Sequence, residues 1–390
     1  MRTAMAVVLG IASLICVGRT SRDAVAADAD SEPVIVVVQA GKGDFTGTDE
    51  RPIVAAIAKA RKAGGGTIQV GPGEYLVRRG IRLADGITIR GTPQTVLRLA
   101  SPRIVQSPAK QGQDFIVVDD AAELAADTCI EIFPPVGMEN FPVGDAAKYS
   151  VEIREIEQGK LMLSQQLPHP IPAKSRVGYR SNLFFVGGST RNVRLQDLTL
   201  DGGRNRQIPM PGHCDRCALL AHGVWSYEDG PTAPPIEGVE LLNCRIRNCY
   251  GRAVAMYSVV RGKVQDCLIE DIDDEAIDLD HFCRHCEVSH NTVRRCQSGV
   301  TINDGSYCLV RGNHLEHCGV GVTVWWWHGC PQENLNVENL IENNVIVSPA
   351  RTGISLGKKC LRNRVTGNTV EGGITVAEPE NNVVEGNTLR

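Results

Sequence analysis

The stretch Leu242-Asn-Cys-Arg-Ile246 returns 23 residues later as Gln265-Asp-Cys-Leu-Ile269, and variants of it follow along the rest of the chain. The apolar residue that closes each copy recurs at seven positions: Ile246, Ile269, Val293, Leu315, Ile346, Val370 and Leu389. Consecutive positions are 19 to 24 residues apart, with one gap of 31. A repeat of this length is typical of a solenoid, in which each copy forms one coil.

Each copy also contains short runs in which apolar and polar residues alternate between Gly or Asn residues. Ala276-Ile-Asp-Leu-Asp280 and Gly299-Val-Thr-Ile-Asn303 are two such runs. Alternation with a period of two indicates strands rather than helices. Glycine is frequent and aromatic residues make up only 5% of the chain, which also suits stacked short strands. We therefore predict an all-β solenoid with one side chain of each pair inside and the other outside.

The segment before the coils has a different pattern. Residues 51–63 are predicted to form a helix with a cap at Thr48 or Asp49 and an end at the three glycines 64–66. One face of this helix carries apolar residues, namely Ile53, Ala56, Ile57 and Ala60. Such a helix would cover the open edge of the first coil.

A longer stretch around this helix resembles a known superfamily. It includes Gly43-Asp44, Thr48-Asp49 and Gly64-Gly-Gly-Thr-Ile-Gln-Val-Gly-Pro-Gly-Glu-Tyr75. It is similar to the opening of the pectate-lyase-like right-handed parallel β-helix proteins, which include polysaccharide lyases, polygalacturonases, alginate epimerases and phage tailspikes. The resemblance implies a right-handed parallel β-helix with an N-terminal capping helix, and a polysaccharide as partner.

The expected organisation is a signal peptide over residues 1–27 followed by a single β-helix domain over 28–390. Within it, 34–110 would hold the cap helix and first coils, 111–180 a small antiparallel β insert, and 181–390 the repeated coils. Residues 111–180 are assigned to the insert because Pro-rich joins interrupt the repeat there.

The N-terminus and the charge indicate where the protein acts. Arg2, an apolar stretch over 4–17 and Ala24-Val-Ala26 are typical of an export signal, and the stretch is too short to span a bilayer. We expect a secreted or periplasmic protein with no membrane partner. A net charge of −4 gives no indication of nucleic-acid binding.

Metal-binding residue types recur in two places. Cys214 and Cys217 have the Cys-x-x-Cys spacing, as do Cys283 and Cys286, and together they could form a tetrahedral zinc site. The acidic turn over 271–275 could hold calcium through its carboxylates, or it could be solvated; these residues are Asp271, Asp273, Asp274 and Glu275. Many of the twelve cysteines between residues 214 and 360 recur at fixed places in the repeat, which favours stacked buried thiols over disulfides.

Two columns of outward side chains follow when the strands are aligned. One contains Ala255, Asp278, Thr301, Thr323 and Ser355, and the other His222, Tyr257, Asp280, Asn303 and Trp325. Neighbours in a column would be about 4.8 Å apart. With His281 and Asp304 beside them, they predict a solvent-facing groove for an extended polymer. Trp325 and Trp327 would offer flat faces to sugar rings, with Trp326 pointing inward, or the tryptophans would plug the loop over 330–336.

Three functions remain open for this face. Proton abstraction next to a uronic carboxylate, as in lyases and C5-epimerases, would use His222 or His281 with Tyr257, and Arg252 would offset the enolate. Hydrolysis of the polygalacturonase type would use Asp278 and Asp280 as paired carboxylates, although the Asn-Thr-Asp and Gly-His-Gly motifs of those enzymes are absent. The third is a non-catalytic, adhesin-like binding face.

The repeat also contains an Asn column, at Asn243, Asn291, Asn313, Asn344, Asn368 and Asn387. We expect these residues in left-handed turns, with their side chains stacked between coils. The last coil has no capping helix in the sequence, so a partner subunit or the chain's own tail is expected to cover it.

Overall fold

The structure is a computed structural model that describes residues 35–39, 41–138, 149–212, 214, 216–332 and 335–390. The predicted signal peptide lies outside the described residues. Within them, no helix is long and apolar enough to cross a membrane.

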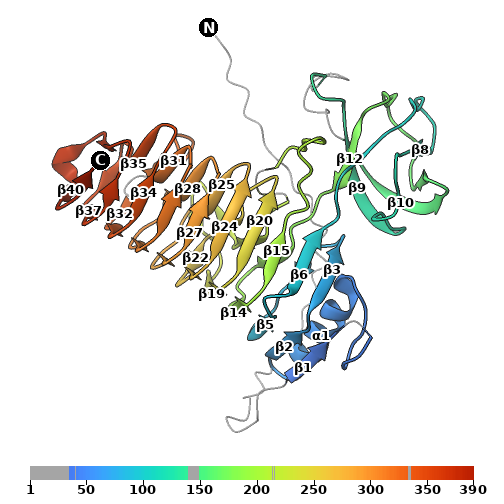
Figure 1. Ribbon diagram of the computed structural model, residues 1–390, viewed down its shortest axis with the longest axis horizontal. Helices are drawn as coiled ribbons and strands as arrows, with labels where there is room; N and C mark the ends of the chain where they lie inside the picture. The colour runs from blue at the N-terminus through green and yellow to red at the C-terminus, as the bar shows by residue number, and fades with distance from the viewer. Residues whose placement is uncertain (1–34, 40, 139–148, 213, 215, 333–334) are drawn as a thin grey trace. The chain divides into compact units, whose positions relative to one another are not determined.

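The chain folds as a right-handed parallel β-helix in which three sheets run along the coils, and every strand pairs in parallel with its neighbours (Figure 1). Sheet A consists of β1 (Ile35–Val38), β2 (Gly66–Val70), β5 (Ile87–Arg90), β14 (Arg191–Gln196), β19 (Ile236–Leu242), β23 (Lys263–Gln265), β26 (Glu287–Ser289), β29 (Leu309–Arg311), β33 (Leu340–Glu342), β37 (Arg364–Thr366) and β40 (Val383–Glu385), with β22 (Val259–Val260) beside β19.

Sheet B consists of β3 (Gly73–Val77), β6 (Thr95–Leu99), β15 (Thr199–Asp201), β20 (Arg245–Cys249), β24 (Leu268–Ile272), β27 (Thr292–Arg294), β30 (His314–Glu316), β34 (Val345–Val347), β38 (Thr369–Val370) and β41 (Thr388–Leu389). Sheet C consists of β4 (Ile81–Arg82), β13 (Phe184–Gly187), β16 (Leu219–His222), β21 (Val254–Tyr257), β25 (Glu275–Leu279), β28 (Ser298–Asn303), β31 (Val320–Trp325), β35 (Thr352–Leu356) and β39 (Ile374–Val376).

The repeat read from the sequence is the register of sheet B. Ile246 pairs with Ile269, Ile269 with Val293, and the series continues to Val370 and Leu389. All but the last of these residues are buried in one continuous apolar core. The alternation therefore predicted the interior correctly, because each β-strand sends successive side chains to opposite faces.

The first coil is covered as expected. Helix α1 (Glu50–Lys62) begins after Asp49, whose carboxylate accepts a hydrogen bond from the backbone N–H of Arg51. Its apolar face is buried through Ile53, Ala56, Ile57 and Ala60.

The antiparallel insert is also present. Its six strands are paired in the order β7 (Arg103–Ile104), β12 (Arg176–Tyr179), β9 (Thr128–Phe133), β10 (Tyr149–Glu157), β11 (Lys160–Leu163) and β8 (Phe115–Val117). It begins at β7, earlier than the expected residue 111, and has an apolar core of its own.

The Asn side chains stack between coils as a hydrogen-bonded ladder, but the left-handed backbone lies one residue before each ladder position rather than at the Asn itself. His290 and Asn343, which precede ladder residues, have the left-handed backbone, with φ of 57° and 54°. Asn243 is another such residue, at φ 50°, so it does not belong to the ladder. The ladder itself consists of Asn291, Asn313, Asn344, Asn368 and Asn387. Cys267 continues it on the N-terminal side, since its backbone N–H donates to the Asn291 side chain.

A second ladder was missed in the sequence. Asn339, Asn363 and Asn382 are linked through their side chains, and Cys308 continues this ladder by donating its backbone N–H to Asn339. All thirteen described cysteines are free thiols, most of them buried, as the repeat favoured. The Sγ atoms of Cys296 and Cys318 lie 3.2 Å apart.

We expect Asn344→Ala to destabilise the β-helix by about 3 kcal/mol. Asn344 is fully buried, donates 2.9 Å hydrogen bonds to the Val310 carbonyl and to Asn368, and accepts from Asn313, so its loss leaves buried polar groups unpaired. Chemical denaturation measures the change. The exposed Asn381→Ala is the control and should change the unfolding free energy by less than about 0.5 kcal/mol.

The last coil exposes apolar side chains. Val383 and Val384 of β40 are 41% and 42% exposed, and Leu389 of β41 is 62% exposed. The expectation that a partner subunit or the chain's own tail covers this end stays a prediction.

Candidate functional site

The alignment of sheet C strands is confirmed by the register. His222 pairs with Tyr257, Ala255 with Asp278, Asp278 with Thr301 and Asn303 with Trp325, so the two predicted columns exist. The interior residues of these strands, Val254, Met256, Ile277, Leu279, Val300 and Ile302, are at most 1% exposed.

The expectation that the outward columns face solvent is wrong. Asp278 and Thr301 are fully buried, and Tyr257, Asp280 and Asn303 are 2–5% exposed. Long excursions between the coils pack on this face. Cys214 contacts the Tyr257 hydroxyl at 3.0 Å, and the Trp225 ring lies parallel to the Tyr257 ring with centroids 6.0 Å apart. Alternation along a strand predicts which side chains point away from the core, but it does not predict which other segments of the chain cover them.

Arg252, at the turn before β21, is the centre of a buried charged cluster. Its Nη1 atom lies 2.6 Å from Asp278 Oδ2 and 3.0 Å from Asp280 Oδ2, and Nε pairs with Glu275. Nη1 also donates to the Tyr257 hydroxyl. Arg252 is only 3% exposed and is held by these acids, so the structure does not leave it free to neutralise an enolate as predicted.

The acids around Arg252 are perturbed by their surroundings. Burial, followed by the charge of Asp280, raises the pKa of Asp278 well above its usual value. Burial also raises the pKa of Glu275. Desolvation opposes the charge of Arg252, but the neighbouring carboxylates, Asp278 first, keep its pKa above the ordinary value. The cluster therefore stays charged at its centre because the acids surround a cation that cannot lose its proton.

A second group of side chains lies around His281, which follows β25. Its Nδ1 is 2.9 Å from Asp304 Oδ2, and its Nε2 is 3.3 Å from the Tyr227 hydroxyl and 3.3 Å from Asp280 Oδ1. Because the Asp304 carboxylate only accepts, Nδ1 carries a hydrogen, and Nε2 lies between the Tyr227 phenol and the Asp280 carboxylate. Asn303 Nδ2 and the His281 backbone N–H each donate to Asp280 Oδ1 at 2.8 Å, which holds this carboxylate in place.

Aromatic rings surround the imidazole. The ring centroids of Trp225 and Tyr227 are each 5.0 Å from that of His281, and Trp327 is 5.8 Å from it and stacks on Tyr227 at 4.4 Å. Trp225, Tyr227 and Trp327 are all partly exposed. The accessible edge of the site is therefore aromatic, while its charges lie beneath.

Trp225 and Tyr227 were not predicted as site residues. They belong to the excursion that contains the short hairpin of β17 (Trp225–Ser226) and β18 (Gly230–Pro231). The only signal in the sequence was the length and Pro content of this excursion, which marked a functional loop without saying where it folds.

His222 lies at the edge of the same site. Its Nδ1 is 2.9 Å from the Gly223 carbonyl, and its ring is 4.9 Å from that of Tyr257. Burial lowers the pKa of His222, so the ring is neutral near neutral pH. Since the carbonyl can only accept, Nδ1 donates and Nε2 keeps its lone pair.

The tryptophans differ from the expectation in part. Trp327 packs with the apolar cluster of Phe282, Cys330 and Leu335. This corresponds to the second alternative from the sequence, in which the tryptophans form a hydrophobic plug under the loop over 330–336. Trp326 does not point into the core. Its Nε1 donates to the Gln332 carbonyl, and Lys359 Nζ lies 3.6 Å from its ring centroid. Trp325 ends β31 and is partly exposed.

Neither predicted metal site is assembled. Cys214 faces Tyr257, whereas Cys283 and Cys286 donate to the carbonyls of Met256 and Val259 inside the β-helix. The acids proposed for calcium are engaged by arginines: Asp271 by Arg295, Asp273 by Arg204, and Asp274 and Glu275 by Arg252. Among the described residues, no three or more Cys, His, Asp or Glu side chains are grouped to hold a metal.

Comparison with known proteins agrees with the fold. Residues 221–339 match the family model described as "Right handed beta helix region". A search of curated protein sequences found no match. The fold thus confirms the resemblance to right-handed parallel β-helix proteins.

Solved structures similar to this chain include the A-module of the mannuronan C-5 epimerase AlgE6 of Azotobacter vinelandii, with 15% identity and a TM-score of 0.49 over 87% of this chain and 94% of that one. Another is the tailspike of the E. coli bacteriophage HK620 in complex with a pentasaccharide, with 12% identity and a TM-score of 0.47 over 87% and 53%.

Proposed function

We propose that this protein is a carbohydrate-active enzyme that abstracts the C5 proton of a uronic acid unit in a polysaccharide, giving β-elimination or epimerisation. The observation that carries the proposal is the Asp304–His281–Tyr227 arrangement on sheet C. The imidazole Nδ1 is held at 2.9 Å by a buried carboxylate, and its Nε2 lies 3.3 Å from a phenol and 3.3 Å from the Asp280 carboxylate.

The two groups have complementary protonation states. Burial, followed by the charge of Asp280, raises the pKa of Tyr227 to about 12, so the phenol keeps its proton at neutral pH. His281 would accept a proton at Nε2 and Tyr227 would donate one, which are the two roles that proton removal and return require. In epimerisation a proton is then added to C5 on the opposite face. In elimination the C4–O bond breaks instead, and the leaving oxygen takes a proton.

A sugar polymer is the substrate that the surroundings favour. Trp225, Tyr227 and Trp327 form a partly exposed aromatic edge, and flat rings of this kind stack on sugar faces. The superfamily that the opening of the chain resembles acts on polysaccharides, which supports the same substrate class. Because the charged groups are buried, we infer that the loop bearing Trp225 and Tyr227 moves to admit the chain.

Paired-carboxylate hydrolysis is less well supported. Asp278 and Asp280 both contact the same nitrogen of Arg252, so their near oxygens are closer together than the roughly 6.5–9.5 Å that an inverting pair needs. Asp278 is also fully buried. Export of the protein to the periplasm or the medium, where such polymers occur, remains part of the proposal.

The test is deuterium incorporation at C5 when uronic acid polymers are incubated with the protein in heavy water, read by NMR. Exchange or inversion at C5 indicates epimerisation, and a new unsaturated uronate absorbing in the ultraviolet indicates elimination. New reducing ends without either signal would show hydrolysis. If the protein alters no polymer in a panel of uronic and neutral polysaccharides, the enzyme proposal fails and the non-catalytic binding protein is the interpretation that stands.

A further inference from the structure

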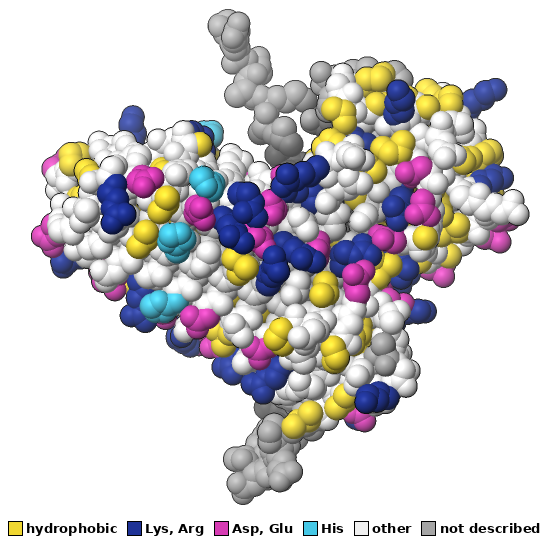
Figure 2. Space-filling model, in the orientation of Figure 1, with side chains coloured by type: hydrophobic (Ala, Val, Ile, Leu, Met, Phe, Trp, Pro, Cys, Tyr) yellow, Lys and Arg dark blue, Asp and Glu magenta, His cyan; other side chains and the backbone are white. Residues whose placement is uncertain are grey.

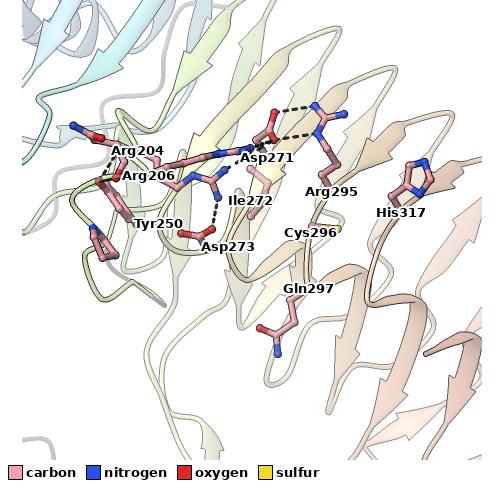
Figure 3. A pocket seen from close by; sticks show the side chains of 12 residues that line it. Arg204, Arg206, Tyr250, Asp271, Ile272, Asp273, Arg295, Cys296, Gln297 and His317 are labelled. Atoms are coloured by element: carbon pink, nitrogen blue, oxygen red, sulfur yellow. Dashed lines mark hydrogen bonds and ion pairs between the residues drawn. The ribbon is translucent and has the colours of Figure 1, made fainter. Parts of the chain in front are cut away.

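A separate open cleft of about 700 Å³ lies where the turns lead from sheet B to sheet C (Figure 3). Turn residues of three consecutive coils line it, at 271–273, 295–297 and His317. The excursion after β15 lines the other side through residues 204–206 and 209. The proposed reaction does not use any of these side chains.

The floor of the cleft is a column of equivalent turn residues. Asp271, Arg295 and His317 all have left-handed backbone, with φ of 60°, 58° and 52°, and each coil donates a backbone hydrogen bond to the next. Asp271 and Arg295 pair directly, with Oδ2 and Nη2 2.8 Å apart. His317 is the next residue in the column, and its side chain is 57% exposed.

Positive charge exceeds negative charge among the lining residues. Arg204, Arg206 and Arg295 line the cleft with two carboxylates, those of Asp271 and Asp273. Arg295 also pairs with Glu270 outside the lining, so the charge that remains available is that of Arg204 and Arg206, which face the carboxylates of Asp271 and Asp273. Figure 3 shows Arg206 and Arg295 directed at the same Asp271 carboxylate, and Arg204 directed at Asp273. Figure 2 shows Lys and Arg side chains gathered near the middle of one face of the molecule, with Asp and Glu between them.

Two features indicate that this surplus is available to a ligand. The side chain of Arg206 is 75% exposed, and among the described residues its one hydrogen-bonded ion pair is with Asp271, at 2.7 Å. The side chain of Arg204 is 7% exposed, yet its Nε has no hydrogen-bond partner among the described residues. A buried donor without an acceptor is unfavourable, so hydrogen bonds do not fully compensate the Arg204 charge, and an anionic group in the cleft would be attracted by that charge.

We propose that this cleft binds an anionic group of the sugar chain, a uronate carboxylate or a sulfate ester, through Arg206 and Arg204. The identity of the ligand as a sugar chain rests on the proposed function. Asp273 of the cleft precedes β25 and His281 follows it, so the cleft and the proposed reaction site lie at opposite ends of this strand.

The experiment measures equilibrium binding of an oligomannuronate and an oligogalacturonate by calorimetry, in the full chain and in Arg206→Gln. We expect the variant to raise the Kd about tenfold, since it removes a charge-assisted hydrogen bond at an exposed position. Arg364→Gln is the matched control, because Arg364 is also exposed and paired with one acid, Glu385, away from the cleft. It should leave the Kd unchanged.

Asp273→Asn is the second variant. Asp273 is 51% exposed and competes with the ligand for Arg204, so its neutralisation should tighten binding about threefold. A structural lesion would not tighten binding. The same oligomers with their carboxyl groups reduced to alcohols should bind weakly and equally to all variants. A sulfated oligomer that binds more tightly, with the same loss in Arg206→Gln, would support the cleft and assign sulfate as its anion.

Equal Kd values for the unmodified protein and Arg206→Gln, or equal binding of charged and reduced oligomers, would overturn the proposal. The result is independent of catalysis, because binding is measured whether or not the oligomer is turned over. If binding depends on Arg206 but no polymer is altered, the cleft stands and the proposed reaction fails. If turnover is present and Arg206 has no effect on binding, the cleft proposal alone fails.

Discussion

His281→Gln is expected to lower the rate of C5 exchange or elimination by about a thousandfold, within the range that a positioned acid or base contributes. Glutamine retains hydrogen-bonding groups next to Asp304 and Tyr227 but has no basic nitrogen at neutral pH. The rate on the responsive polymer is measured by NMR or ultraviolet absorbance. Circular dichroism and thermal unfolding establish that the variant is folded, which matters because His281 is only 4% exposed.

Two further variants sharpen this result. Asp304→Asn should also reduce the rate strongly, because the amide no longer fixes the proton on Nδ1 at 2.9 Å. His285→Gln is the control, since His285 is exposed and stacks on Tyr307 with centroids 5.1 Å apart, away from Asp304. Rates equal to that of the unmodified protein in both His281→Gln and Asp304→Asn would remove the imidazole from the mechanism.

Arg252→Met is expected to lower the free energy of unfolding at pH 7 by about 3–5 kcal/mol, because it leaves buried carboxylates without their cation. Denaturant unfolding measures the loss. The control is Arg311→Met, which breaks an exposed pair with Glu287 and should cost less than about 1 kcal/mol. Adding Asp278→Asn to Arg252→Met should recover part of the loss, since one stranded charge is removed.

The loss of unfolding free energy in Arg252→Met should increase as the pH rises. Burial raises the pKa of Asp278 above its ordinary 3.8 in the folded protein, so the folded state binds more protons than the unfolded state above that pH. The contribution of Asp278 to stability therefore falls as pH rises from about 4, and the fall should extend to higher pH without Arg252. A deficit that is constant from pH 4 to 8 would show that lost packing, rather than stranded charge, accounts for the effect.

Part of the candidate site followed from sequence alone. Alignment of the runs after each Gly placed His222 beside Tyr257 and Asp278 beside Thr301, as the pairs in sheet C confirm. The alignment also placed His281 and Asp304 next to these columns, and the side chains of these two residues contact each other. The partners of His281 beyond the coils, Trp225 and Tyr227, were not foreseen, because an excursion without a repeat has no register from which its position can be read.

The sequence by itself determined the coil. A period near 23 residues with two-residue alternation fixes which strands stack and which side chains point inward, since both follow from local backbone geometry and burial of apolar surface. What lies over the outward face follows from long-range packing instead. The loops from 214, 225 and 327 pack on this face and bury Asp278 and Asp280 around Arg252, while the segment over 204–209 lines the cleft at the turns before sheet C. Their positions depend on contacts between residues far apart in the chain, and no local pattern encodes those.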